Sequence, residues 1–173
     1  AIWLEVGFGG AEHLTGQAER HREIGFIGAE PFDEGVAKAL GQIEDHGLSN
    51  VRLHHGDIRN VLDLLAPAVL DRVFILFPDP WPKKRQQKRR LIQPEFLKSL
   101  ARVMKPGAKL RFATDVASYA DEALGHFLAE PAFEWSAERA DDWRIAPADH
   151  IETRYQIKQL GDCAPVYFDF TRI

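Results

Sequence analysis

Apolar runs alternate with amphipathic stretches along most of this chain. A short continuous apolar run between turn residues is typical of a buried strand, and apolar residues at helical spacing, such as Val36, Leu40 and Ile43, predict a helix. The pattern predicts strands over residues 2–6, 25–29, 51–54, 72–77 and 109–113. It predicts helices over residues 12–22, 32–46 and 58–65, from about Pro94, and over 116–129.

The alternation of strands and helices predicts the fold class. Each crossover helix must cover the face of the sheet that it passes, so the strands are expected to be parallel. Beyond Pro131, two further strand-like runs, 133–135 and 166–170, flank a long polar stretch that suits a functional loop. We therefore expect an α/β protein with a doubly wound, Rossmann-like sheet, mostly parallel, with an antiparallel C-terminal edge hairpin.

The length of 173 residues fits one domain, and we expect residues 1–173 to form it. The first residues read as a strand already under way, with no initiating Met. We therefore expect an N-terminal segment to be missing from this sequence.

Acidic residues stand at the carboxyl ends of four predicted strands. Ligands of doubly wound sheets bind at these ends. The candidates are Glu5 with the Gly7–Gly10 turn, Glu30, Asp57 and Asp79. The glycines permit close backbone approach to a ligand. Glu30 lies about 20 residues beyond the turn, where a carboxylate can accept hydrogen bonds from ribose hydroxyls. Asp57 can accept a hydrogen bond from the amino group of a purine.

The glycine turn favours S-adenosylmethionine over a dinucleotide. A dinucleotide fingerprint reads G-x-G-x-x-G, but Gly7 and Gly9 are followed by Glu12 at the third glycine position. Glu5 would repel a pyrophosphate, whereas it could hold a cationic aminoacyl group. S-adenosylmethionine has adenine, a ribose and a cationic tail but no phosphate, so it is the expected cofactor.

A rigid, basic segment follows the fourth predicted strand. The prolines of Pro78-Asp79-Pro80-Trp81-Pro82 stiffen the loop that presents Asp79. Six cations follow within eight residues, although the chain as a whole has a net charge of −4: Lys83, Lys84, Arg85, Lys88, Arg89 and Arg90. A basic run beside a nucleoside pocket suits a polyanionic substrate, although such runs are often only solvated surface.

The remaining residues do not favour other chemistry. His54 and His55 are neighbours in a strand and point to opposite faces, so they cannot chelate one metal, and we expect no metal site. The single cysteine, Cys163, fits a reducing cytoplasm. The chain has no apolar run of about 18 residues, so no membrane span is expected. No obligatory protein partner is inferred.

The segment from Phe77 to Arg90, FPDPWPKKRQQKRR, resembles the signature of bacterial tRNA (guanine-N7-)-methyltransferases of the TrmB family. Other matches follow in family order across essentially the whole chain: LEVGFG from Leu4, GAE from Gly28, ATD from Ala113 and TRYQ from Thr153. The FPDPWPKKR string is highly specific, whereas the glycine motif alone is not.

The resemblance implies an enzyme that methylates N7 of a guanosine in the variable loop of tRNA, at tRNA position 46. It implies that the S-adenosylmethionine site is lined by Glu5, Gly7, Gly9, Glu30, Asp57 and Asp79. It implies substrate contacts by Lys83, Asp115, Thr153, Arg154, Tyr155 and Gln156, and tRNA contacts by Lys84, Arg85, Lys88, Arg89 and Arg90. Gln156 departs from the family, in which Glu is common at this position.

Asp79 is the expected catalytic residue. Guanine N7 has a free lone pair, so no general base is needed, and a carboxylate near the ring would stabilise the positive charge that develops there. Two alternatives stay open: a methyltransferase of the same fold that acts on a small molecule or a protein, and a non-catalytic RNA-binding module. A nicotinamide dehydrogenase comes last, because the dinucleotide fingerprint is incomplete.

Overall fold

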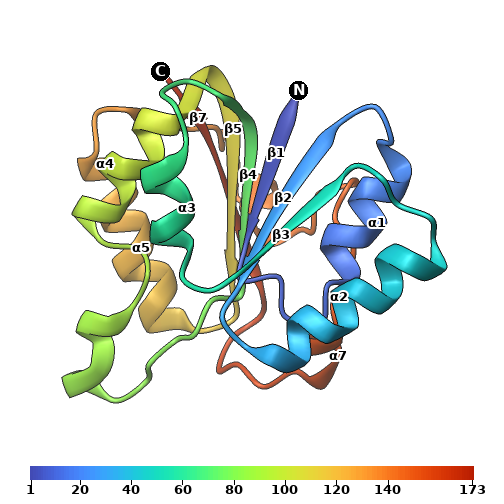
Figure 1. The fold of residues 1–173 in the computed structure, drawn as a ribbon. Coiled ribbons are helices and arrows are strands. Elements are labelled where there is room, and N and C mark those ends of the chain that lie inside the picture. The colour runs from blue at the N-terminus through green and yellow to red at the C-terminus, as the bar shows by residue number, and fades with distance from the viewer.

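A computed structural model describes all residues, 1–173, and contains one seven-stranded sheet (Figure 1). The strand order is β3-β2-β1-β4-β5-β7-β6. The strands are β1 (Ile2–Val6), β2 (Gly25–Glu30), β3 (Val51–His55), β4 (Leu70–Leu76), β5 (Met104–Thr114), β6 (Phe133–Trp135) and β7 (Val166–Arg172).

The pairing of the strands confirms the predicted sheet. Strands β1 to β5 are parallel to one another, and β7 runs antiparallel between β5 and the edge strand β6. The chain passes from β1 outward through β2 and β3, then returns to place β4 on the other side of β1. The strand order thus reverses between β1 and β4, and the carboxyl ends at such a switch point leave a crevice for a ligand.

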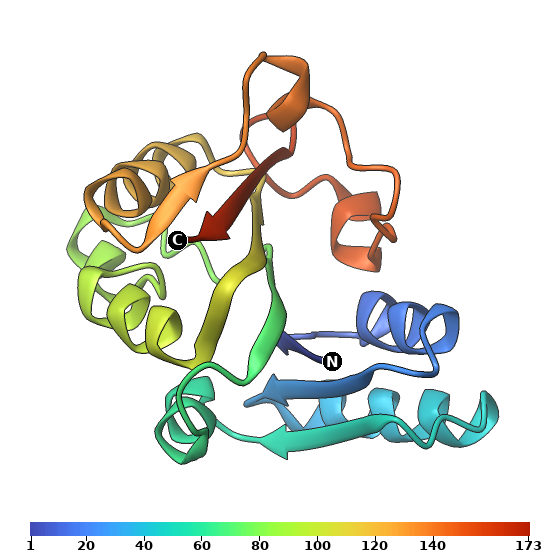
Figure 2. The ribbon, with the colours of Figure 1, turned by 90° about the horizontal axis from the view of Figure 1, so that it is seen from above.

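Helices cover both faces of the sheet (Figures 1 and 2). On one face lie α1 (Glu12–Arg20) and α2 (Asp33–Asp45), and on the other α3 (Ile58–Leu64), α4 (Pro94–Val103) and α5 (Ala117–Ala129). The two short helices α6 (Asp141–Arg144) and α7 (Arg154–Lys158) belong to the long polar segment before β7. No helix combines the length and the apolar character needed to cross a membrane.

The larger core lies between the sheet and helices α3 to α5. It contains 27 buried residues, and aromatic rings from β5, β7 and α5 meet in it, with Phe127 and Phe170 stacked at 4.1 Å between ring centroids. A smaller cluster that includes Phe8, Leu14 and Phe26 fills the space under α1 and α2. Burial on both faces explains the uninterrupted apolar runs of the central strands.

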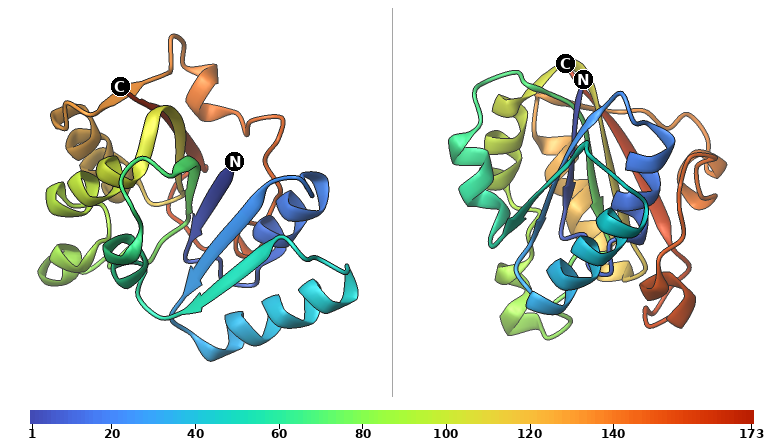
Figure 3. Two further views of the ribbon diagram at one scale, coloured as in Figure 1. Left: turned by 45° about the horizontal axis from the view of Figure 1, so that its top comes forward. Right: turned by 45° about the vertical axis from the view of Figure 1, so that its right-hand side comes forward.

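Two stretches contain short helices that the sequence pattern did not predict. The basic segment forms a 3₁₀ helix, η1 (Lys84–Arg89), and the polar stretch before β7 contains α6 and α7. Both chain ends lie at the amino end of β1, whereas η1 and α7 flank the opposite end of the sheet (Figure 3, right). The connections that follow the parallel strands therefore gather away from the termini.

Candidate functional site

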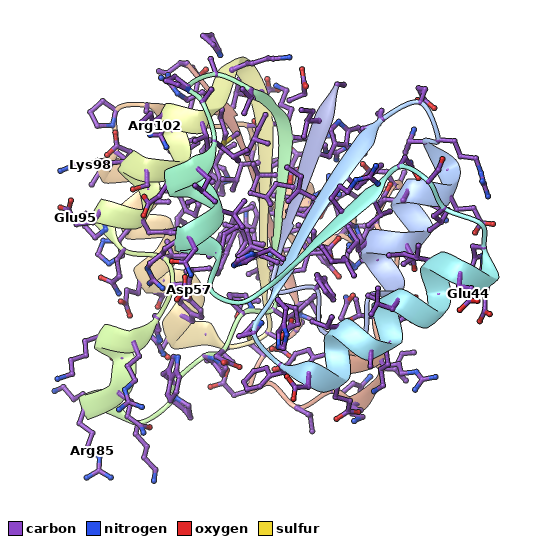
Figure 4. The ribbon with its side chains drawn as sticks, in the orientation of Figure 1. Glu44, Asp57, Arg85, Glu95, Lys98 and Arg102 are labelled. Atoms are coloured by element: carbon purple, nitrogen blue, oxygen red, sulfur yellow. The ribbon has the colours of Figure 1, made fainter.

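A cavity of about 370 Å³ opens at the carboxyl ends of the parallel strands. Its walls come from the connections after β1, β2, β3 and β4, together with Arg89 and Leu91 from the basic segment and its end. Figure 4 shows Asp57 at this end of the sheet. The volume is in the range of small-molecule sites, and the position is the one that the strand order predicts.

The turn after β1 presents its backbone to the cavity. Gly7 and Gly9 have φ values of 66° and 51°, in the left-handed region that favours glycine. A methyl group added at either position would meet no protein atom within 4 Å, so both glycines border open space. Both line the cavity, as the sequence predicted.

Glu30 holds this turn from the end of β2. Its side chain is buried, and Oε2 accepts a hydrogen bond from the Gly9 backbone N–H at 2.8 Å. Oε1 accepts from the Phe32 N–H at 3.2 Å. Each carboxylate oxygen has a second lone pair, so Glu30 can still accept hydrogen bonds from a ligand.

Asp57 lies in the cavity wall with a second, structural role. It is the N-cap of α3, where Oδ1 accepts from the Arg59 N–H at 2.8 Å. The Arg59 guanidinium also lies 3.0 Å from Oδ2. About half of the Asp57 side chain is exposed, so this carboxylate remains accessible at the cavity.

The loop after β4 carries Asp79 and Trp81 into the cavity wall. Phe77 and Trp81 have φ values of 52° and 42°, which is uncommon for residues other than glycine and costs conformational energy. The guanidinium of Arg89 lies 5.0 Å from the centre of the Trp81 ring. Asp79 is exposed and lines the cavity, and its charge contributes to raising the pKa of Tyr155.

Glu5 does not line the cavity in this structure, so its expected contact with the cofactor stays a prediction. Its side chain is buried, and Oε2 lies 2.7 Å from Nδ1 of the buried His13 on α1. Successive residues of a strand point to opposite faces, and Glu5 points under α1 rather than toward the cavity. The residue therefore supports the turn from below and makes no direct wall contact.

The cavity wall contains residues that the sequence analysis missed. Pro31 and Phe32 follow Glu30 directly, and Phe32 leaves 64% of its surface exposed. Arg59 and Leu91 also line the cavity. An aromatic residue two positions after the acid of β2 was a usable signal for Phe32. No local pattern marked Leu91, because the fold alone brings it to this wall.

A second cavity, of about 560 Å³, lies between the end of β5 and the α7 segment. It is lined by Asp115, Glu152, Gln156, Tyr167 and the turn 161–165, and by no Lys or Arg. Asp115 is 5% exposed and accepts a hydrogen bond from the Tyr155 hydroxyl at 3.3 Å. This region brings Asp115 together with the TRYQ motif, as the resemblance implied.

Tyr155 lies between the two cavities. Burial, followed by the carboxylates of Asp115 and Asp79, raises the pKa of Tyr155 to about 12. Its ring packs at 5.5 Å from the ring of Phe77, which precedes the Asp79 loop. The hydroxyl is therefore a neutral donor, and it donates to Asp115.

Thr153 and Gln156 form a capping box for α7. The Thr153 hydroxyl oxygen accepts from the Gln156 N–H, and Gln156 Oε1 accepts from the Thr153 N–H at 3.2 Å. The Gln156 amide also donates to the Tyr167 hydroxyl at 2.9 Å, and Oε1 lies 2.7 Å from His150 Nε2. The buried Gln156 amide is satisfied by these bonds and also lines the second cavity, so its expected contact with the substrate stays a prediction.

The exposed cations of the basic segment form a surface around η1. Figure 4 shows Arg85 projecting into solvent from η1. The exposed cations are Lys83, Lys84, Arg85, Lys88 and Arg89. Arg154, on α7, is also exposed, with Glu12 at 3.6 Å.

Arg90 corrects the expected tRNA-binding set. It is 1% exposed and pairs with Glu122 at 2.6 Å, so its guanidinium cannot reach a phosphate.

Known proteins define the class to which this fold and cavity belong. A methyltransferase family model matches residues 1–167. A 16S rRNA (adenine(1408)-N(1))-methyltransferase from Catenulisporales acidiphilia is similar in structure, with a TM-score of 0.65, 19% identity, and coverage of 99% of this chain and 87% of that chain. A Streptococcus mutans methyltransferase in complex with SAH gives a TM-score of 0.66 at 12% identity, over 100% of this chain and 89% of that one. The fold is that of the Rossmann-like methyltransferases.

Sequence relatives narrow the class. A tRNA (guanine-N(7)-)-methyltransferase of Hyphomonas neptunium is 59% identical over 98% of this chain and 78% of the relative. The enzyme of the same name from Caulobacter vibrioides is 60% identical over 99% of this chain and 76% of the relative. That from Rhodospirillum rubrum is 49% identical over 99% of this chain and 68% of the relative. The chain belongs to the tRNA (guanine-N(7)-)-methyltransferase family.

Proposed function

We propose that this protein transfers the methyl group of S-adenosylmethionine to N7 of a guanosine in tRNA, at position 46 of the variable loop. The observation that carries the proposal is the joint placement of Glu30, Asp57 and Asp79 around one cavity that the exposed cations of η1 adjoin. The names of the relatives support the acceptor and the reacting atom. A tRNA substrate agrees with the cytoplasmic location expected from the single cysteine.

The cavity fits S-adenosylmethionine by its donor and acceptor set. Gly7 and Gly9 leave open space where side chains would otherwise project, and Glu30 can accept from ribose hydroxyls. Asp57 can accept from the adenine amine, and the exposed Phe32 offers an apolar surface to the ring. When bound, the cofactor supplies an electrophilic sulfonium methyl group.

Asp79 supplies negative charge where the acceptor base becomes positive. The N7 lone pair of guanine is free at neutral pH, so no side chain has to remove a proton. A fixed carboxylate in a partly enclosed site stabilises developing positive charge more strongly than water does. The stiff proline loop holds Asp79 in place at low entropic cost.

Asp115 and Tyr155 are suited to select guanine. The N1–H and N2 amino groups of guanine are donors that a carboxylate accepts, and adenine lacks this pair of donors. A buried Asp115 left unpaired by the wrong base would carry a large penalty, which can amount to several orders of magnitude in rate. The neutral Tyr155 hydroxyl donates to Asp115, which lines the second cavity.

A methyl-transfer assay tests this function. Unmodified tRNA and S-adenosylmethionine with a labelled methyl group should give one labelled 7-methylguanosine in the variable loop, found by mapping the modified base. A label on another base, or on protein or a small molecule only, would contradict the proposal and favour another acceptor.

The Asp79→Ala variant tests the catalytic assignment. We expect turnover to fall by at least about a hundredfold, because the charge beside the reacting base is lost. The fold and most of the tRNA affinity should be retained, since Asp79 is exposed and the η1 cations are unchanged. Turnover near that of the wild type would contradict the role of Asp79.

A further inference from the structure

Arg90 is a buried cation at the end of the basic segment. Its guanidinium makes four hydrogen bonds, all within the protein. Nε donates to the Pro80 carbonyl oxygen at 2.7 Å, and Nη1 donates to Glu122 Oε2 at 2.6 Å and to the Ser118 carbonyl oxygen at 3.3 Å. Nη2 donates to the Ser118 hydroxyl at 2.8 Å.

These bonds join the loop that carries Asp79 to the helix that follows Asp115. Pro80 lies between Asp79 and Trp81 in the loop after β4. Ser118 and Glu122 lie in α5, which begins two residues after Asp115. The guanidinium also packs 4.8 Å from the centre of the Tyr119 ring, and the Tyr119 hydroxyl accepts from the Ile92 N–H at 3.2 Å. One side chain therefore links the Asp79 loop to the helix that follows Asp115.

The loop after β4 requires such a link. Phe77 and Trp81 both have positive φ, and residues in this region hold that conformation only where their surroundings enforce it. The Arg90–Pro80 bond fixes the carbonyl directly before Trp81. It also joins the two ends of the segment 80–90, which contains η1.

We propose that Arg90 is a positioning residue that fixes Asp79 relative to Asp115, and that it takes no part in binding tRNA phosphates. The inference rests on the proposed function for its effect on turnover. A buried guanidinium without partners is strongly disfavoured, so the loop stays in the one arrangement that gives each of the three guanidinium nitrogens a partner. Lysine cannot replace it, because an ammonium group lacks the planar fork that reaches Pro80 and α5 together.

The Arg90→Lys variant tests the link. We expect kcat for tRNA methylation to fall about tenfold or more, since small misplacements of reacting groups are costly. The Kd values for S-adenosylmethionine and tRNA should stay within about threefold, because the cavity wall and the exposed cations are retained. Hydrogen exchange at the amides of Asp79, Trp81 and Lys83 should become faster, while exchange in β1 is unchanged.

Two further variants control this experiment. Arg102→Lys changes a guanidinium that bonds the Leu62 and Leu65 carbonyl oxygens at the opposite end of the molecule (Figure 4). It should leave kcat and the loop amides unchanged. Glu122→Gln removes the charge that pairs with Arg90 and keeps the side-chain shape, so kcat should fall in the same direction, by about fivefold. If Arg90→Lys does not fold, Glu122→Gln tests the same link between the Asp79 loop and α5.

The outcomes separate the alternatives. Normal kcat with unchanged loop exchange in Arg90→Lys would overturn the proposal, as would an equal loss of kcat in Arg102→Lys. A salt dependence of tRNA binding that becomes shallower in Arg90→Lys, with kcat retained, would instead make Arg90 a phosphate ligand. If the wild type methylates no tRNA but loop exchange still rises in Arg90→Lys, the proposed function fails and the positioning role of Arg90 stands.

Discussion

Glu30 has a structural and a binding role at the same carboxylate. Its oxygens accept the N–H groups of Gly9 and Phe32, so the side chain shapes the glycine turn before any ligand binds. The same oxygens keep free lone pairs toward the cavity. A site built in this way needs little reorganisation on binding, which lowers the entropic cost of association.

Glu30→Gln should lower the affinity for S-adenosylmethionine by about tenfold to a hundredfold, because hydrogen bonds to a charged acceptor contribute about 1.5–3 kcal/mol. Isothermal titration calorimetry would measure the change. Glu34→Gln is the matched control: Glu34 pairs with Lys38 on the exposed face of α2 and should leave the affinity unchanged. Equal effects of the two substitutions would refute the assignment of Glu30.

At the scale of the element, α2 is seated directly against the glycine turn. A methyl group added at Gly35 would lie 2.5 Å from the Gly9 carbonyl oxygen and 2.9 Å from Glu30 Cγ. Only a glycine permits this approach, because real Cβ atoms do not come so close to backbone. The first turn of α2 therefore controls the shape of the cavity without lining it.

The same substitution at two positions of α2 tests this point. Gly35→Ala should displace the helix and weaken S-adenosylmethionine binding by about tenfold, with a loss of about 1–3 kcal/mol in the free energy of unfolding. Gly41→Ala, where an added methyl group meets nothing within 4 Å, should stabilise the protein by about 0.5–1 kcal/mol and leave binding unchanged. Denaturant unfolding and calorimetry distinguish the two; equal binding losses would argue against steric control.

The 3₁₀ helix η1 carries exposed cations, of which Arg85 projects into solvent in Figure 4. The double substitution Arg85→Glu, Lys88→Glu should weaken tRNA binding by about tenfold or more. The slope of log K against log salt should become shallower by about 1 for each tRNA phosphate that the protein no longer neutralises. Lys98→Glu, on α4 far from η1 in Figure 4, should have little effect. An unchanged slope in the double variant would place the RNA elsewhere.

At the scale of the whole molecule, Asp149 docks the long segment before β7 onto the sheet. Its carboxylate pairs with Arg72 of β4 at 2.6 Å and with Arg111 of β5 at 2.8 Å. Its backbone carbonyl oxygen accepts from Gln17 of α1 at 2.6 Å. These bonds hold the segment that continues into Tyr155. Burial opposes ionisation, but the pairs with Arg111 and Arg72 outweigh it and lower the pKa of Asp149 to about 2.

The lowered pKa predicts an acid-dependent loss of stability. The ion pairs stabilise the fold fully above the ordinary pKa of 3.8, and this contribution is lost as the pH falls through about 2. Asp149→Asn should therefore reduce the free energy of unfolding at pH 7, by about 1 kcal/mol or less because the side chain is partly exposed. The difference should vanish below about pH 2. A constant difference across this range in urea denaturation would contradict the role of the ionised carboxylate.

Much of the fold and part of the site follow from local pattern. Hydrophobic periodicity located the parallel strands, and the rule that ligands bind at strand ends brought Glu30, Asp57 and Asp79 together in advance. Local pattern did not predict the contacts that Glu5 and Gln156 make with residues elsewhere in the chain. Glu5 faces His13, and Gln156 is held by its helix cap, His150 and Tyr167.

The sequence by itself determined the order of strands and helices, the chemistry of the strand ends and the family. These depend on periodicity and on residue types at short spacing. Only the tertiary structure decided which of the basic residues face solvent. Arg90 has the same charge as Arg89, but the fold places Arg89 beside Trp81 at the cavity and buries Arg90 between Pro80 and α5. Burial and ion pairing are set by contacts between residues far apart in the chain, which no local pattern records.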